Sequence, residues 1–205
     1  MDVAGALVEQ GRLLADVIRV SDPATPVPTC PGWTLRKLVG HVGRGDRWAA
    51  EIVATGHPVE LRAVPDGRAP DDPADTADWL RGGAELLVRR AAADPDAQVW
   101  TFLGPRPASW WVRRRLHEST VHRADAVLAL DEPYSIAPEL AADGISEHLD
   151  ILAQRPEPGP APLAPGTDLH LHATDGDLGA AGEWVVRGAG SVITWAPGHV
   201  KATTA

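Results

Sequence analysis

The sequence of 205 residues contains a single cysteine, Cys30, and one residue each of methionine, tyrosine and phenylalanine. One thiol excludes an intramolecular disulfide framework and is typical of a reducing compartment. No stretch approaches the roughly 18 apolar residues that a membrane-spanning helix needs. The N-terminus also lacks a basic segment followed by an apolar one, so no signal peptide is expected. We therefore expect a cytoplasmic protein with no membrane partner.

Positive charge is scarce as well, because 19 lysines and arginines stand against 28 aspartates and glutamates, for a net charge of −9. This balance argues against sequence-independent nucleic-acid binding, which needs a cationic surface to displace counterions. The sequence also has no glycine-rich phosphate loop and no dinucleotide fingerprint. Small anionic substrates are not excluded, since a few local arginines are enough to bind them.

Apolar residues recur at helical spacing in most of the sequence, between connectors rich in proline and glycine. Thr34 is a good N-cap for the second of the segments. The pattern predicts five helices, at residues 3–20, 34–55, 73–93, 109–130 and 137–153. We expect a mainly α protein with an up-and-down helical bundle.

The pattern changes after residue 154. A proline-rich linker is expected at residues 155–166. Beyond it, apolar residues alternate with a period of two, which predicts short strands at residues 169–173, 183–187 and 191–195. The expected domains are therefore a bundle at residues 1–154 and a small α+β or β-rich module at residues 167–205. Such a small module must lean on the helical part or on another subunit, which would make the protein a homodimer.

Three ionisable residues share one face of the fourth predicted helix. At about 100° per residue, Glu118 and His122 lie within roughly 40° of each other, and Asp125 lies within about 20° of Glu118. Trp111 is on the same stripe, and apolar residues flank it, so we expect this face to point to an interior. Ionisable groups in an interior are costly unless they are paired or bind a metal. The arrangement therefore predicts a metal site.

The flanking apolar residues are Val121 and Leu128. A partner for the stripe is predicted on the second helix, where His41 shares a face with Leu38 and Trp48 and so points inward. Two imidazoles and one carboxylate suit Zn²⁺ with a fourth position open to water or substrate. The same set can hold Fe(II). We predict His41, Glu118 and His122 as the ligands of a divalent metal, for which zinc is the best candidate.

Asp125 is the predicted catalytic residue, either orienting a ligand, facing the substrate or moving a proton. Simpler interpretations exist for the others: His41 can be a hydrogen-bonded core residue, and Glu118 with His122 can be an ordinary pair on a solvated helix face. His117 lies off the stripe and is expected at the rim. The spacing differs from His-Glu-x-x-His by one residue, which disfavours protease chemistry.

Further candidates are weaker. Cys30 could be a nucleophile, but no base partner is recognisable and a structural role is favoured. His170 and His172 alternate on one strand face and could bind a metal, although such histidines are usually surface residues. Arg114 projects toward the stripe and could hold an anionic group of a substrate.

Several motifs together resemble a known family. They are Cys-Pro-Gly-Trp-Thr at residues 30–34, Leu-Val-Gly-His at 38–41, and His-Glu-x-x-x-His-Arg-x-Asp at 117–125. Residues 169–175 and 182–184 look like the C-terminal domain of the same proteins. The chain is similar to the mycothiol-dependent maleylpyruvate isomerase family, which implies a DinB-like bundle at the N-terminus. Since family members usually continue further, we expect the C-terminal module to be truncated.

The resemblance implies that His41, Glu118 and His122 bind the metal and that Asp125 lies in the active site. It also implies mycothiol as a co-substrate, beside a small-molecule substrate. We therefore expect a zinc-dependent isomerase or S-transferase in which a metal-bound thiolate attacks a small electrophile. The alternatives are a metal-dependent hydrolase on the same ligands, or a non-catalytic metal- or ligand-binding regulatory protein.

Overall fold

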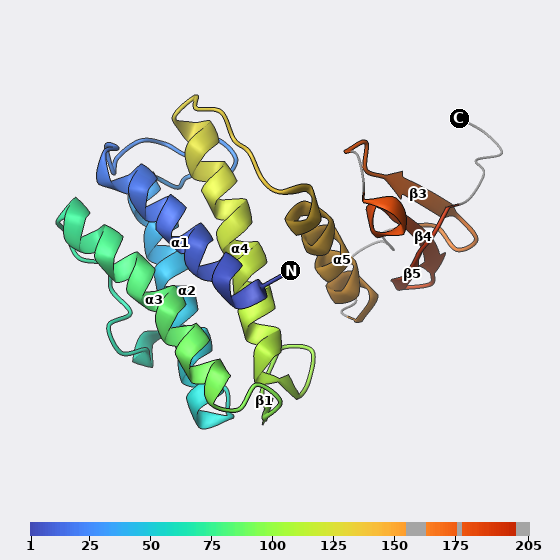
Figure 1. Cartoon of the computed structure of the whole chain (residues 1–205), viewed down its shortest axis with the longest axis horizontal. Coiled ribbons are helices and arrows are strands. Elements are labelled where there is room, and N and C mark those ends of the chain that lie inside the picture. The colour runs from blue at the N-terminus through green and yellow to red at the C-terminus, as the bar shows by residue number, and fades with distance from the viewer. Residues whose placement is uncertain (155–162, 176–177, 200–205) are drawn as a thin grey trace. The chain divides into compact units, whose positions relative to one another are not determined.

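The computed structural model describes residues 1–154, 163–175 and 178–199. Within these residues the chain is mainly helical, with a small antiparallel sheet near the C-terminus (Figure 1). The chain forms two compact units, Met1–Tyr134 and Ser135–Ala205. The α-helices are α1 (Val3–Arg19), α2 (Leu35–Thr55), α3 (Pro73–Ala93), α4 (Ala108–Ala129) and α5 (Pro138–Gln154). The predicted mainly α class with a β-rich C-terminal part is confirmed.

Local capping signals explain where α1, α2 and α3 begin and where α2 ends. The Asp2 side chain accepts a hydrogen bond from the backbone in the first turn of α1, and Thr34 does the same for α2. Asp72 caps α3, in which Pro73 occupies the first turn, where its missing N–H costs nothing. Gly56 ends α2 with φ 75°, a left-handed conformation that suits glycine.

The first unit is a four-helix bundle in which α1 and α2 each pack against α3 and α4. Helices α2 and α3 run parallel to each other. Near their N-terminal ends Gly43 lies against Trp79, and near their C-terminal ends Arg90 forms an ion pair with Glu51 at 2.6 Å. Residues 56–72, which include the short helix η1 (Leu61–Ala63), therefore form a crossover rather than a hairpin. The bundle is as expected, but this connection departs from simple up-and-down order.

A continuous apolar core joins the four helices of this unit. Its fully buried side chains include Leu14, Leu35, Leu38 and Leu80, and Ala126 contributes from α4. Two short strands, β1 (Gln98–Val99) and β2 (Arg106–Pro107), pair antiparallel in the connection between α3 and α4. Two residues are too few to produce a periodic pattern, which is why the sequence did not predict these strands.

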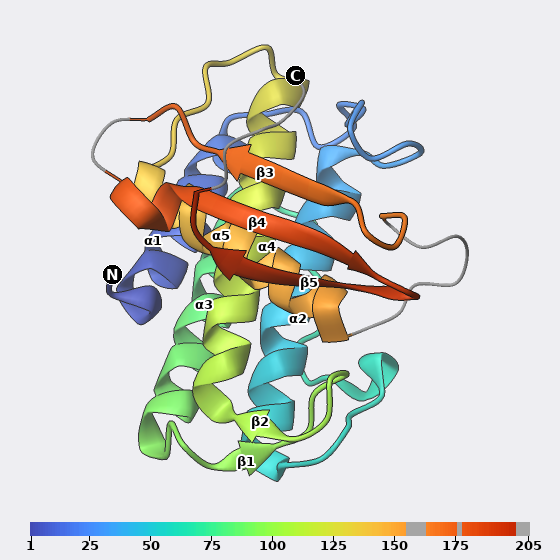
Figure 2. The same ribbon diagram turned by 90° about the vertical axis from the view of Figure 1, so that its right-hand side faces the viewer.

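The second unit consists of α5 and a sheet in which β3 (Asp168–His172), β4 (Glu183–Ala189) and β5 (Val192–Pro197) are adjacent and antiparallel. The short helix η2 (Gly179–Gly182) precedes β4. Helix α5 covers one face of the sheet (Figure 2). Two indole nitrogens tie the sheet to this helix: Trp184 donates to Ser146 at 2.9 Å, and Trp195 donates to Asp150 at 3.2 Å.

Helix α5 therefore groups with the strands, whereas we expected it within a bundle ending at residue 154. Its periodicity predicted a buried face but not the element that covers it. Residues 155–162 of the expected linker lie outside the described residues. Among the residues that the structure describes, no helix combines the length and apolar character needed to cross a membrane.

Candidate metal centre

Helices α2 and α4 bring the three predicted ligands together. The Oε2 atom of Glu118 lies 3.6 Å from Nε2 of His41 and 3.8 Å from Nε2 of His122. All three donor atoms lie within 4.8 Å of one another. Two ligands that each lie about 2.1 Å from a tetrahedral zinc ion are roughly 3.4 Å apart. The spacing is therefore close to what a shared divalent ion requires.

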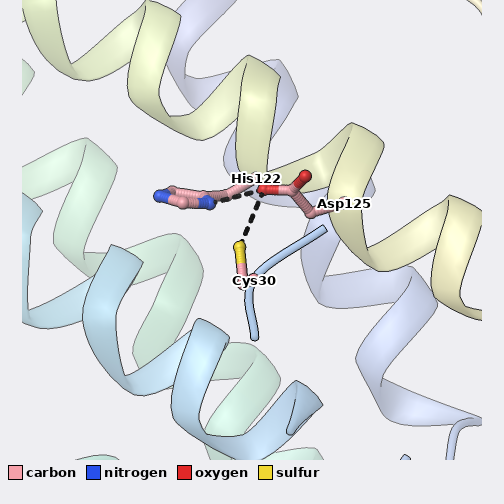
Figure 3. Close-up of side chains that lie close together, drawn as sticks. All are labelled: Cys30, His122 and Asp125. Carbon is pink, nitrogen blue, oxygen red and sulfur yellow. Dashed lines mark hydrogen bonds and ion pairs between the residues drawn. The ribbon is translucent and has the colours of Figure 1, made fainter. Parts of the chain in front are cut away.

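The second ring nitrogen of His122 is held by Asp125, one turn along α4. Asp125 Oδ2 lies 2.9 Å from His122 Nδ1 (Figure 3). A carboxylate in this position favours the tautomer with the proton on Nδ1, which leaves the lone pair on Nε2. The carboxylate thus directs the His122 lone pair toward Glu118 and His41.

Two arginines hold the Glu118 carboxylate. Arg114 forms an ion pair with Oε1, and Nη1 of Arg115 lies 3.5 Å from Oε2. Arg115 is itself anchored on α2, where it donates to Asp46 at 2.8 Å and to the Val42 carbonyl at 3.1 Å. Because Arg114 engages Oε1, Oε2 is the oxygen that faces the imidazoles. Arg114 was a candidate for holding an anionic group of a substrate, and in the structure the anion beside it is Glu118.

The anchoring of Arg115 depends on a glycine and on a buried carboxylate. A Cβ atom at Gly45 would lie 2.8 Å from the Arg115 guanidinium carbon, so only glycine leaves this space free. Asp46 is buried, and burial raises the pKa of its carboxyl, against the opposing effect of the Arg115 charge and hydrogen bond. Arg115 therefore connects the buried Asp46 carboxylate on α2 to the Glu118 carboxylate on α4.

Burial keeps both histidines in the form that can bind a metal. Burial lowers the pKa of His41, and the charges of Arg115 and Arg44 lower it further. Burial also lowers the pKa of His122, although the hydrogen bond with Asp125 opposes this shift. Both rings are accordingly neutral at neutral pH, and a neutral imidazole offers the lone pair that a metal needs.

Cys30 also reaches this cluster, although its sequence neighbours offer no recognisable partner. Its Sγ atom lies 3.5 Å from Asp125 Oδ2, the oxygen that also contacts His122 (Figure 3). Burial, followed by the Asp125 charge and hydrogen bond, raises the pKa of the thiol. The two residues are 95 positions apart, so no local spacing could reveal the pair. Cys30 therefore has a carboxylate partner, and burial together with that partner keeps the thiol protonated.

The Cys-Pro-Gly-Trp-Thr segment also lines the cluster through Trp33. The Trp33 ring centroid lies 5.1 Å from that of His41 and 6.0 Å from that of His122, and the His122 ring is stacked at 25° to it. This contact restrains both imidazole rings. The motif at residues 30–34 thus contributes two side chains to the site, from a loop ahead of α2.

The face of α4 is less interior than expected. Trp111 is buried, but Val121 is 59% exposed and Leu128 is 55% exposed. Helical periodicity gives the angle between residues around a helix, but it does not say which side of the helix packs against other elements. Here the packed side of α4 does not include Val121 and Leu128. His41 has 40% of its side chain exposed, so the cluster borders solvent. His117, expected at the rim, is instead buried.

A comparison with known protein families gave a match that covers most of the first unit. Residues 4–127 match the family model described as mycothiol maleylpyruvate isomerase N-terminal domain. The match spans more than half of the chain and includes Cys30, His41, Glu118, His122 and Asp125. Searches of curated proteins and of solved structures found no match. By its family-model match, the chain belongs to the mycothiol maleylpyruvate isomerase N-terminal domain family.

Proposed function

We propose that this protein binds a divalent cation, best suited to zinc, through His41, Glu118 and His122. We further propose that it uses the ion with a low-molecular-weight thiol such as mycothiol, in the isomerisation or S-transfer of a small electrophilic substrate. The observation that carries the proposal is the convergence of three donor atoms around Glu118 Oε2, with Asp125 on the far nitrogen of His122.

The residues present fit a metal ion. Two neutral imidazoles and one carboxylate are the donor set of many catalytic zinc sites, which keep a further position open. The same set also suits Fe(II), so metal analysis has to identify the ion. When bound, a divalent cation would lower the pKa of a coordinated thiol and favour its thiolate.

The state of Cys30 supports the need for an external thiol. Its pKa is raised by burial and by Asp125, so at neutral pH it carries its proton and is a poor nucleophile. The chain has no other cysteine. A thiol nucleophile at this site would therefore come from a small molecule, which would approach along the solvent-exposed side of His41.

Asp125 is best assigned as a positioning residue. Its Oδ2 atom accepts from both Cys30 and His122, and it acts on the site through the orientation of the imidazole. We propose that it fixes the His122 tautomer and holds the ring against Trp33. A direct role in proton transfer would require substrate contact at the same carboxylate.

Metal analysis tests the ligand set. His41→Ala and Glu118→Ala should each lose one equivalent of zinc per chain relative to the wild type, because three ligands become two. His57→Ala, which removes an exposed histidine of the same unit, is the matched control and should keep the wild-type content. Undiminished zinc in both site variants would contradict the proposal.

Turnover tests the chemistry. Maleylpyruvate, the substrate named by the family, should be converted by the zinc-loaded protein in the presence of mycothiol and not in its absence. Thiol-independent turnover would instead support a metal-dependent hydrolase. Zinc binding with neither turnover nor any signal change on addition of thiols would indicate a non-catalytic protein.

A further inference from the structure

A second histidine-rich cluster lies in the C-terminal unit, where three segments meet at Glu183. Nε2 of His170 lies 3.0 Å from Glu183 Oε2, and Nδ1 of His199 lies 2.7 Å from the same oxygen. The His170 and His199 rings are 5.0 Å apart and meet edge to face. The cluster thus repeats the composition of the first site, with two imidazoles and one carboxylate.

Strand pairing brings these residues together. Glu183, the first residue of β4, stands opposite His172 on β3, and His170 lies two residues earlier on the same strand face. The backbone N–H of Gly198 donates to the Glu183 carbonyl at 3.1 Å, which continues the β4–β5 contact past the end of β5. That hydrogen bond positions the following residue, His199, beside the carboxylate.

We propose that His170, Glu183 and His199 form a second metal site, for a divalent transition-metal ion of the zinc class. The three donor atoms lie within 4.8 Å of one another, and imidazole with carboxylate is a ligand set that such ions accept. His170 is partly buried, whereas His199 has 61% of its side chain exposed and can adjust its distance to an ion. The ring of a further imidazole, His172, lies 6.0 Å from that of His170.

Binding would exchange two hydrogen bonds for coordination. In the metal-bound form each imidazole would offer the nitrogen that now faces Glu183, and its proton would lie on the other ring nitrogen. Hydrogen bonds to His199 and His170 hold the pKa of the Glu183 carboxyl below its usual range, so the carboxylate is already ionised at neutral pH. The ion could therefore bind to these three residues without the help of any other group.

A metal bound at this site would stabilise the folded form of the second unit. The apolar core of this unit is small, with Ala142, Leu149, Trp184, Val186 and Ile193 as its buried members. Units of this size gain stability from metal ions because the ion binds the folded form only. The site would link β3, the start of β4 and the segment after β5, in addition to their backbone hydrogen bonds.

The two proposed sites can be separated by stoichiometry. The tag-free full chain, dialysed to equilibrium against Zn²⁺, should hold two ions, whereas His199→Ala and His41→Ala should hold one each and the double variant none. Glu183→Gln, which keeps the shape of the side chain, should also lose one ion. His148→Ala, which removes an exposed histidine on α5, is the control and should keep both.

Thermal unfolding provides a second measurement. In the His41→Ala background, Zn²⁺ should raise the unfolding temperature, and the added His199→Ala change should abolish that increase. The proposal is overturned if His199→Ala retains both ions, or if the wild type holds a single ion that His41→Ala removes. If His199→Ala loses an ion and His41→Ala does not, the first site fails and this one stands.

Discussion

At the scale of single residues, each side chain of the first site has a contact that restrains its orientation. Asp125 takes one nitrogen of His122 and leaves the other. Arg114 takes one oxygen of Glu118, and Trp33 restrains the ring of His41. Such supporting contacts reduce the orientational freedom that would otherwise be lost when an ion binds.

The first residue-scale prediction concerns Asp125. Asp125→Asn removes the negative charge that favours the correct His122 tautomer, so zinc affinity should fall by about 10- to 100-fold. Competition with a chromophoric chelator measures this change. Cys30→Ala, which removes another partner of Asp125, should leave zinc affinity close to that of the wild type and should retain turnover. Loss of turnover in Cys30→Ala with intact zinc binding would contradict an external thiol.

A second prediction follows from the lowered pKa values of His41 and His122. Their ordinary value is 6.5, so below that pH the unfolded chain binds protons that the folded metal-free protein does not. The free energy of unfolding should therefore fall as the pH drops through 6.5, and this contribution should level off below the folded pKa values. Urea unfolding of chelator-treated protein between pH 7 and pH 5 measures the slope. His122→Gln should reduce it, and an unchanged slope would contradict the assignment.

The sequence predicts which residues lie together when they belong to one helix, because their spacing then determines the face that they share. Glu118, His122 and Asp125 lie within eight consecutive residues of one helix, so their shared face follows from helix geometry alone. Cys30 meets Asp125 through the fold, from a loop, and no period relates them. Val121 was expected beside an interior face but is exposed, for a related reason: the period of a helix does not encode which elements pack against it.

At the scale of elements, capping residues make the boundaries of α2 predictable. Thr34 begins α2 and Gly56 ends it, and both are signals that act within one turn. The parallel arrangement of α2 and α3 was not predictable, because a connection as long as residues 56–72 permits either direction. The assignment of α5 depends in the same way on contacts such as the Trp184–Ser146 hydrogen bond, which join distant positions.

A matched pair of glycines on α2 tests the packing of α2 on α3. A Cβ atom at Gly43 would overlap the Trp79 ring, so Gly43→Ala should lower the free energy of unfolding by roughly 1–3 kcal/mol. A Cβ atom at Gly40 would have no neighbouring atom within 4 Å, so Gly40→Ala should be neutral or stabilising by up to about 1 kcal/mol. Chemical denaturation of both variants gives the two values. Equal effects would show that α2 and α3 do not approach at Gly43.

At the scale of the whole molecule, each compact unit has a core of its own. Leu80 belongs to the core of the first unit, and Ile193 to that of the second. Two separate cores predict that unfolding is not a single two-state transition.

Large-to-small substitutions in the two cores test this expectation. Leu80→Ala should cost about 2–5 kcal/mol and should reduce hydrogen-exchange protection in α1 to α4, while the amides of β4 keep theirs. Ile193→Ala should have the opposite pattern. Loss of protection in both units by either variant would show one cooperative structure instead.

The placement of the proposed ligands on α2 and α4 has a consequence for biosynthesis. His41 and His122 are roughly 80 residues apart, and an ion that joins them closes a loop worth about 4.5 kcal/mol of chain entropy in the cross-link model. A nascent chain that has emerged only as far as α3 carries a single donor, His41. If an ion binds these residues as proposed, its loading would await the synthesis and docking of α4, so a bound ion would mark completed folding of the first unit.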